Sequence, residues 1–213
     1  MLKQKTYIGI IIFLVFVLFV SFYIKDDDNK QYQELLKEIE DTEQKNSELH
    51  LQLEEAEKEK EEVKQSLVKE IAKGFKYRQF DVNFSNLSSF SPTQFYEEMY
   101  KKFNEYATED AMEHLLKHNA FYHAVMMAEG TRSNLRMSQM HIKDLKFESE
   151  EEVVLFYDVD IEFERLDLEN QKQYMTNPGI LRLILTDDGW KVNIDEQRMR
   201  SLEEVKEHLN QQE

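Results

Sequence analysis

The chain is 213 residues long, which allows one ordinary domain together with additional segments. Its formal net charge is −16, from 27 basic and 43 acidic residues. A surface that binds nucleic acid needs basic side chains to displace counterions from phosphates, so we expect no nucleic-acid partner. Cysteine is absent, which excludes disulfide bonds, thiol chemistry, zinc–cysteine clusters and a lipid-modified cysteine anchor.

The N-terminal region contains an uncharged run, Tyr7 to Ile24, in which fourteen of eighteen residues are Ile, Leu, Phe or Val. As a helix this run is about 27 Å long, close to the hydrocarbon thickness of a bilayer. A cleaved signal peptide would have a shorter apolar core followed by small residues, but this run ends in large apolar residues before Lys25. We therefore expect a retained transmembrane helix that contacts membrane lipid.

The orientation of this helix follows from the charges beside it. Lys3 and Lys5 lie in the short segment 1–6, and positive charge favours the cytoplasmic side. We predict a single-pass protein of the cell membrane with residues 1–6 in the cytoplasm and the C-terminal domain outside it.

Residues 29–73 contain no Pro or Gly and are rich in Glu, Lys and Gln, which favours a helix. Apolar residues recur at alternating steps of three and four, the pattern of a coiled coil through which chains self-associate. Asn46 and Lys60 occupy a positions, where polar residues favour two strands in register. A solvated single helix with pairs such as Glu54–Lys58 is the alternative. The predicted seam consists of Tyr32, Leu35, Ile39, Thr42, Asn46, Leu49, Leu53, Ala56, Lys60, Val63 and Leu67.

Gly74 interrupts the heptad pattern, and glycine commonly ends helices, so we expect the stalk to stop there and residues 74–90 to form a connector. Ser91, Pro92 and Gln94 form a helix-start signal for a domain over 91–196. Thr108 predicts a second helix cap, followed by an apolar helix face that continues towards Gly130.

The spacing then changes to period two. In 153–165 one face is apolar throughout and the other is mostly acidic, which predicts an antiparallel strand with one side in water. We expect further strands at 135–147, 180–186 and 190–195, with a hairpin between the last two at Asp187-Asp188-Gly189. Asn177-Pro178-Gly179 predicts either a turn or a bulge. Residues 197–213 are expected to form a short polar helix and tail.

Helices followed by a sheet of about four strands that ends in Asp-Asp-Gly-Trp-Lys-Val-Asn-Ile-Asp resemble the nuclear transport factor two-like superfamily over residues 91–196. That resemblance implies an α+β domain in which helices pack on a curved, cone-shaped antiparallel sheet. The superfamily includes isomerases, dehydratases and non-catalytic assembly domains, so the fold alone assigns no activity.

Catalytic members of that superfamily need an acid or base inside the cone. Here the four acidic side chains of strand 153–165 (Asp158, Asp160, Glu162 and Glu164) lie opposite its apolar face, so we expect them in solvent. If the cone is open, its pocket would be lined by Leu155, Tyr157, Ile161, Tyr174 and Trp190. Buried tyrosines are usually core residues, and Trp190 is more typical of a core anchor.

Metal binding has weak support in the sequence. His114 and His118 are one helical turn apart, and His123 is five residues further on. However, the sequence has neither a His-Glu-x-x-His arrangement nor an evident carboxylate as the third ligand. No phosphate-binding glycine loop or nucleophile motif is present. We expect no catalytic residues, no metal and no cofactor.

Anchor, stalk and cone domain together resemble, in architecture, the bitopic assembly subunits of conjugation and type IV secretion systems in Gram-positive bacteria. The cysteine-free, Lys-, Glu- and Ile-rich composition is similar to that of exported proteins of low-GC Gram-positive bacteria. This resemblance implies a non-enzymatic scaffold that binds protein partners. Two alternatives stay open: binding of a small apolar or envelope ligand in the cone, and an isomerase or dehydratase that uses His123 or Asp158.

Overall fold

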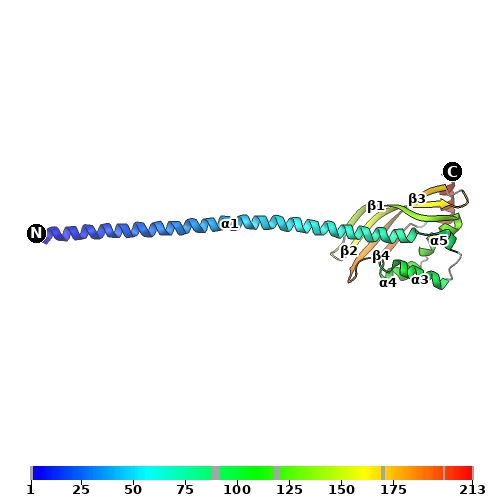
Figure 1. The fold of residues 1–213 in the computed structure, drawn as a ribbon, viewed down its shortest axis with the longest axis horizontal. Helices are drawn as coiled ribbons and strands as arrows, with labels where there is room; N and C mark the ends of the chain where they lie inside the picture. The colour runs from blue at the N-terminus through cyan, green and yellow to red at the C-terminus, as the bar shows by residue number, and fades with distance from the viewer. Residues whose placement is uncertain (1, 88–91, 118–119, 169–170, 199, 213) are drawn as a thin grey trace. The chain divides into compact units, whose positions relative to one another are not determined.

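In the computed structural model the backbone is described except at residues 1, 88–91, 118–119, 169–170, 199 and 213. Side chains 2–14, 21–31, 92–93, 95–96 and 120–121 are also outside the described set. The elements follow the order of one long helix, four shorter helices, four strands and a final helix (Figure 1). The chain divides into two compact units, Met1–Glu61 and Glu62–Glu213.

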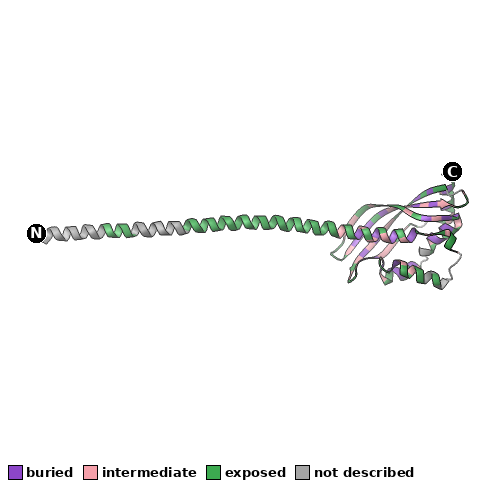
Figure 2. Cartoon of the chain, viewed as in Figure 1, coloured by how far each residue is buried: buried purple, intermediate pink, exposed green. Residues whose placement is uncertain are grey.

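Helix α1 extends from Leu2 to Phe80 and contains the whole predicted stalk. Within the first unit, the side chains of residues 32–61 are exposed, as Figure 2 shows in green. The predicted membrane span, Tyr7 to Ile24, falls mostly on side chains outside the described set. Among the residues that are described, no helix has a stretch long and apolar enough to cross a membrane.

The expected end of the helix at Gly74 is wrong, because α1 continues to Phe80. A Cβ atom at Gly74 would lie 2.2 Å from Cε1 of Tyr106, so this glycine permits a close approach of an aromatic ring. The residues that follow it include Phe75 and Phe80, which are buried in the core of the second unit. Burial of these rings favours continuation of the helix over a cap at the glycine.

Four helices separate α1 from the sheet: α2 (Phe84–Leu87), α3 (Pro92–Phe103), α4 (Glu109–Lys117) and α5 (Ala120–Thr131). The start of α3 at Pro92 agrees with the helix-start signal, although the capping residue Ser91 lies outside the described residues. The predicted cap at Thr108 is confirmed, because its Oγ1 accepts a hydrogen bond from the Ala111 N–H at 3.1 Å.

The sheet has four antiparallel strands in sequential order: β1 (Ser133–Phe147), β2 (Glu152–Arg165), β3 (Gln171–Thr186) and β4 (Gly189–Gln197). The α+β class with a curved antiparallel sheet is therefore as expected (Figure 1). The predicted hairpin is also confirmed, since Thr186 pairs with Gly189. The C-terminal helix is α6 (Leu202–Asn210), which begins with a capping box between Ser201 and Glu204.

Asn177-Pro178-Gly179 forms neither a turn nor a bulge, because these residues lie inside β3 and pair regularly with β2. Proline has no N–H to donate, so it is tolerated only where a strand lacks a neighbour on one side. The pairing of β3 with β4 begins at Gly179, opposite Gln197, and Pro178 lies just beyond it. The proline therefore interrupts no hydrogen bond to β4.

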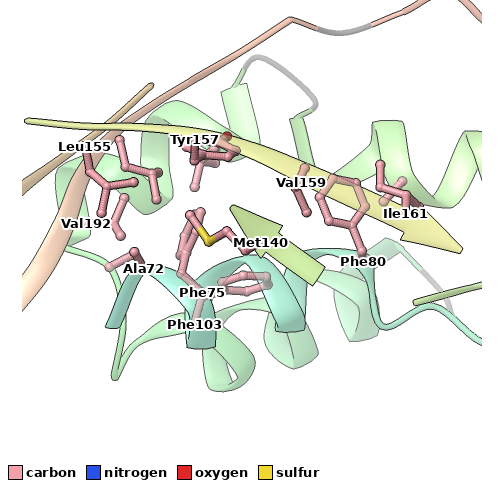
Figure 3. Packing of buried hydrophobic residues seen from close by; sticks show 14 of the residues in the cluster. Ala72, Phe75, Phe80, Phe103, Met140, Leu155, Tyr157, Val159, Ile161 and Val192 are labelled. Atoms are coloured by element: carbon pink, nitrogen blue, oxygen red, sulfur yellow. The ribbon is translucent and has the colours of Figure 1, made fainter. Parts of the chain in front are cut away.

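The apolar face of β2 packs against α1. Figure 3 shows side chains of α1 and α3 pointing toward the sheet and filling the space beneath it. Phe75 and Phe103 meet edge to face with centroids 5.3 Å apart. The residues of β2 that alternate in sequence are all buried: Val153, Leu155, Tyr157, Val159, Ile161 and Phe163.

The acidic face of β2 lies on the other side of the sheet, as expected. Asp158 pairs with Lys143 of β1 at 2.6 Å, and Glu162 pairs with Lys172 of β3 at 2.9 Å. The side chains of Asp158 and Lys143 keep 22% and 57% of their exposure, so solvent screens this pair. These carboxylates form a charged outer surface of cross-strand pairs.

Candidate functional site

A cluster of five polar side chains lies inside the second unit, between the end of α1 and the sheet. We call it the interior polar cluster; it consists of Lys76, Gln79, Tyr157, Asp195 and Gln197. The ammonium of Lys76 donates hydrogen bonds to both carboxylate oxygens of Asp195, at 2.8 and 2.7 Å. It also contacts the side-chain oxygens of Gln79 at 2.8 Å and Gln197 at 2.9 Å. The Tyr157 hydroxyl donates to Asp195 at 3.0 Å.

The register of the sheet brings these groups together. Gly179 of β3 lies between Tyr157 and Gln197 in the pairing, and a Cβ atom there would be 2.3 Å from the Tyr157 hydroxyl oxygen. The tyrosine side chain therefore crosses over a residue without a side chain to reach β4. Leu181 is opposite Asp195 and is fully buried, so this carboxylate is on the inner face of the sheet.

Burial dominates the electrostatics of the cluster. It lowers the pKa of the Lys76 ammonium from its ordinary value of 10.5, although the charge of Asp195 and its hydrogen bond oppose this shift. Burial also raises the pKa of the Tyr157 phenol above its ordinary value of 10.0, and the nearby Asp195 charge adds to the rise. The four acceptor oxygens around Lys76 are the surroundings of a protonated amine.

The chemistry available to this cluster is limited. A protonated lysine has no lone pair with which to attack a substrate, and Asp195 accepts hydrogen bonds from two donors already. The side chains of Lys76 and Asp195 are 0% and 2% exposed. The cluster therefore fixes the rotation of α1 relative to β4 and offers no reactive group to solvent.

The five predicted pocket residues do not form a common cavity. Leu155 and Ile161 are fully buried in the packed core, and Tyr157 belongs to the interior polar cluster. Trp190 is also a core residue, and its ring meets Phe147 edge to face. Tyr174 lies on the outer face instead, where its hydroxyl donates to Glu162 at 3.2 Å. Four of the five residues that would line an open cone are therefore packed in the interior of the domain, and the fifth lies outside it.

A cavity of about 270 Å³ lies elsewhere, beside the end of α1 and near α2, α3 and α5. Its lining includes Arg78, Asp81, Leu87, Met99 and Lys102. Lys102 donates to the backbone carbonyl of Asp81 at 2.8 Å, and burial lowers the pKa of its ammonium. This lining mixes both charges with apolar side chains and shows no pair of groups set for acid–base chemistry.

The sequence singles out three histidines, His114, His118 and His123, of which the structure describes two. His123 contacts the Arg200 carbonyl oxygen at 2.7 Å through Nε2, and His118 lies outside the described residues. In the part of the chain that is described, no three His, Asp or Glu side chains are placed to hold a metal ion.

The most extensive candidate surface is the apolar seam of α1. Leu35, Leu49 and Leu53 are 54–58% exposed, although leucine at such positions normally packs against a partner. Asn46 and Lys60, at a positions, are exposed on the same helix. A row of exposed apolar side chains at heptad spacing can bind another helix with the same spacing.

Sequence reasoning missed the interior polar cluster. Lys76 was expected in the connector, yet Val68, Ala72, Phe75 and Gln79 show the helical spacing of the stripe in which it lies. This spacing is a signal that the sequence does contain. The inward direction of Asp195 had no such signal, because strict alternation from Trp190 and Val192 places that residue outside.

Comparisons with known proteins do not assign a family. No family model matches the chain, and no curated protein matches it. Among solved structures, a periplasmic fragment of TraM is 7% identical, with 64% of this chain and 98% of that chain covered and a TM-score of 0.43. An IcmL-like type IV secretion system protein from Legionella pneumophila is 9% identical, with 62% and 89% covered and a TM-score of 0.44.

A third similar structure is a nuclear transport factor two-like protein of unknown function from Shewanella oneidensis. It is 13% identical, with 62% of this chain and 97% of that chain covered and a TM-score of 0.35. At these identities and scores the three likenesses assign neither a partner nor an activity to this chain.

Proposed function

We propose that this chain is a non-enzymatic, single-pass membrane protein whose folded domain lies outside the cytoplasm and acts as a scaffold in a multi-protein envelope apparatus. The exposed apolar seam of α1 carries this proposal, because its leucines are 49–58% exposed in the single chain at the spacing of a coiled coil. Assembly would bury this seam against another helix, and removing apolar surface from water favours association.

The interior of the domain supports a non-enzymatic role. Lys76 and Asp195, a lysine and a carboxylate buried side by side, are saturated by each other and by neighbouring polar groups. The phenol of Tyr157, which also belongs to this cluster, has a raised pKa, and its hydroxyl donates a hydrogen bond to Asp195. These are the properties of a structural network.

The class of apparatus follows from the architectural resemblance to assembly subunits of conjugation and type IV secretion systems. The apolar run Tyr7 to Ile24 supports attachment to the membrane, and Lys3 and Lys5 favour a cytoplasmic N-terminus. A helical stalk followed by a domain with a packed core is consistent with a scaffold that positions other proteins.

Topology is tested by single-cysteine labelling, which the absence of native cysteine makes unambiguous. We would introduce Lys206→Cys on the exposed side of α6 and, as the matched control, Gln4→Cys before the apolar run, which keeps Lys3 and Lys5. A membrane-impermeant maleimide should label Lys206→Cys in intact cells and label Gln4→Cys only after lysis. Labelling in the reverse order would exclude an extracytoplasmic scaffold.

Self-association is tested by disulfide formation in intact membranes. Leu49 is on the seam at a d position, while Leu51 is slightly more exposed but faces away from the seam, at an f position. Leu49→Cys should form a covalent dimer under mild oxidation and Leu51→Cys should not. Equal cross-linking of both variants would indicate random collision and contradict pairing through the seam.

A further inference from the structure

The apolar seam does not stop at the boundary of the stalk. Val63 and Leu67 continue its alternating spacing, and both belong to the compact unit Glu62–Glu213. They are 54% and 49% exposed. The same helix therefore presents apolar side chains to solvent within the folded domain.

The opposite side of this helical segment is buried in the domain's own core. Val68, Ala72 and Phe75 are each fully buried. At 100° per residue the mean direction of these three side chains lies roughly 125° from that of Val63 and Leu67. One side of α1 is thus used for folding, and the other is left for a partner without displacing the sheet.

Gly74 is the next a position after Leu67, so it points in nearly the same direction from the helix. There the ring of Tyr106 approaches so closely that a Cβ atom on Gly74 would lie 2.2 Å from its Cε1 atom. The guanidinium of Arg78 lies 4.2 Å from the centroid of the same ring and holds it over the helix. The domain's own aromatic ring therefore covers the helix where a partner helix would next make contact.

The residue at the intervening d position agrees with this boundary. Glu70 would face a second Glu70 in a parallel pair, and like charges at such close range are unfavourable. Sequence and structure therefore place the end of the seam after Leu67.

We infer that a second copy of this chain packs in parallel against Val63 and Leu67, so that the coiled coil continues into the folded unit as far as Leu67 and stops before Gly74, where Tyr106 takes the place of the partner helix. This inference rests on the proposed self-association. A second copy is the occupant because the heptad phase is continuous from Tyr32 to Leu67, and Asn46 at an a position meets its own counterpart only in a parallel pair in register.

The consequence concerns the folded domains. Paired helices lie about 8–10 Å apart, so pairing at Leu67 holds two domains side by side. Partners would then meet a pair of domains in a fixed arrangement and not two independently tethered ones.

The test is a ladder of single-cysteine variants of the full chain in membranes: Leu49→Cys, Val63→Cys, Leu67→Cys and Tyr77→Cys. Tyr77 is the d position beyond Gly74 and is 50% exposed, so accessibility alone does not protect it. We expect disulfide dimers at the first three positions and their loss at Tyr77. Cross-linking at Leu49 without cross-linking at Val63 and Leu67 would overturn the inference while leaving self-association intact. Absence of dimers at all four positions would overturn both.

The role of Tyr106 has its own test. Tyr106→Ala uncovers Gly74, so in that background the disulfide at Tyr77→Cys should increase. Leu49→Cys in the same background controls for intact assembly and should be unchanged. Cross-linking at Tyr77→Cys as strong as at Leu67→Cys when Tyr106 is present would overturn its role as the end of the seam.

Discussion

Lys76 and Asp195 form a buried ion pair that joins α1 to β4, with Nζ 2.7 and 2.8 Å from the two carboxylate oxygens. The two residues are 119 positions apart in sequence. Since Lys76 lies on a helix that also carries the exposed seam, the pair fixes which side of this helix faces the sheet. The ion pair therefore determines which side of α1 is available for another chain.

Lys76→Met tests the importance of this pair. The variant leaves the Asp195 carboxylate buried without its cation, which costs about 3–5 kcal/mol of unfolding free energy. Adding Asp195→Leu removes the unpaired buried charge, so the double variant should recover much of the lost unfolding free energy. The unfolding free energies of the native protein, Lys76→Met and the double variant can be measured by urea denaturation, followed by the fluorescence of Trp190, the single tryptophan.

Lys101→Met is the matched control, because Lys101 is exposed on α3. Its effect should stay within about 0.5 kcal/mol, as for most surface substitutions. An equally small effect of Lys76→Met would show that the pair does not hold α1 in place.

Tyr157 predicts how stability changes at alkaline pH. Its folded-state pKa is raised above 10.0, so the stability it contributes is complete below about pH 10 and is lost as the pH rises further. The loss is about 1.4 kcal/mol per pH unit, because the phenol ionises in the unfolded chain and stays protonated in the fold. Tyr157→Phe removes this loss, so the difference in unfolding free energy between the two proteins should narrow above pH 10.

The lowered pKa of Lys76 has the opposite effect on stability. Since the unfolded chain keeps the lysine proton up to about pH 10.5, the contribution of Lys76 to the unfolding free energy rises as the pH approaches that value. Lys76 is present in both proteins, so the comparison isolates the phenol. Urea midpoints measured at a series of alkaline pH values would give the difference, and a constant difference would contradict a protonated Tyr157 in the fold.

The sequence predicts the inward-facing side chains of a strand only where no register shift interrupts their alternation. Period-two spacing in β2 correctly placed Leu155, Ile161 and Phe163 inside the sheet, because pleated strands alternate without exception unless a bulge intervenes. A register shift does intervene between β3 and β4: Leu183 pairs with Val192, but Arg182 pairs with Ile194. The extra residue, Asn193, turns Asp195 inward.

Gly74 and Lys76 were misplaced for a different reason. Glycine after a helical pattern usually marks the end of the helix, and lysine usually lies in solvent. Here the glycine makes room for Tyr106, and the lysine has an acidic partner on β4. The helical spacing of Val68, Ala72 and Phe75 indicates that the helix continues, but the contacts that explain Gly74 and Lys76 come from residues distant in sequence.

Replacing Asn177 by an apolar residue should increase the stability of the domain. It is fully buried opposite Val159, and neither atom of its amide has a hydrogen-bond partner among the described residues. Asn177→Leu keeps a similar size and removes the unsatisfied amide, which should raise the unfolding free energy by about 1–2 kcal/mol. Asn193→Leu is the control and should gain nothing, because Asn193 accepts a hydrogen bond from Thr108 at 3.0 Å. A loss in Asn177→Leu would indicate that a buried water satisfies the amide.

Gly179→Ala should destabilise the domain, although alanine normally improves on glycine inside a strand. The added Cβ would lie 2.3 Å from the hydroxyl oxygen of Tyr157, whose side chain is itself enclosed by the core. Overpacking of this kind costs about 1–3 kcal/mol, and the same urea measurement would detect it. Unchanged or increased stability would show that Tyr157 can move away from β3.

The central claim is that the exposed seam of α1 pairs two copies of this chain. Sedimentation equilibrium of residues 26–213, which lack the apolar run, measures this directly. The account predicts twice the chain mass for the native sequence and for Leu51→Glu, and the mass of a single chain when Leu49→Glu and Leu53→Glu are combined. A single-chain mass for the native sequence up to high concentration would contradict it.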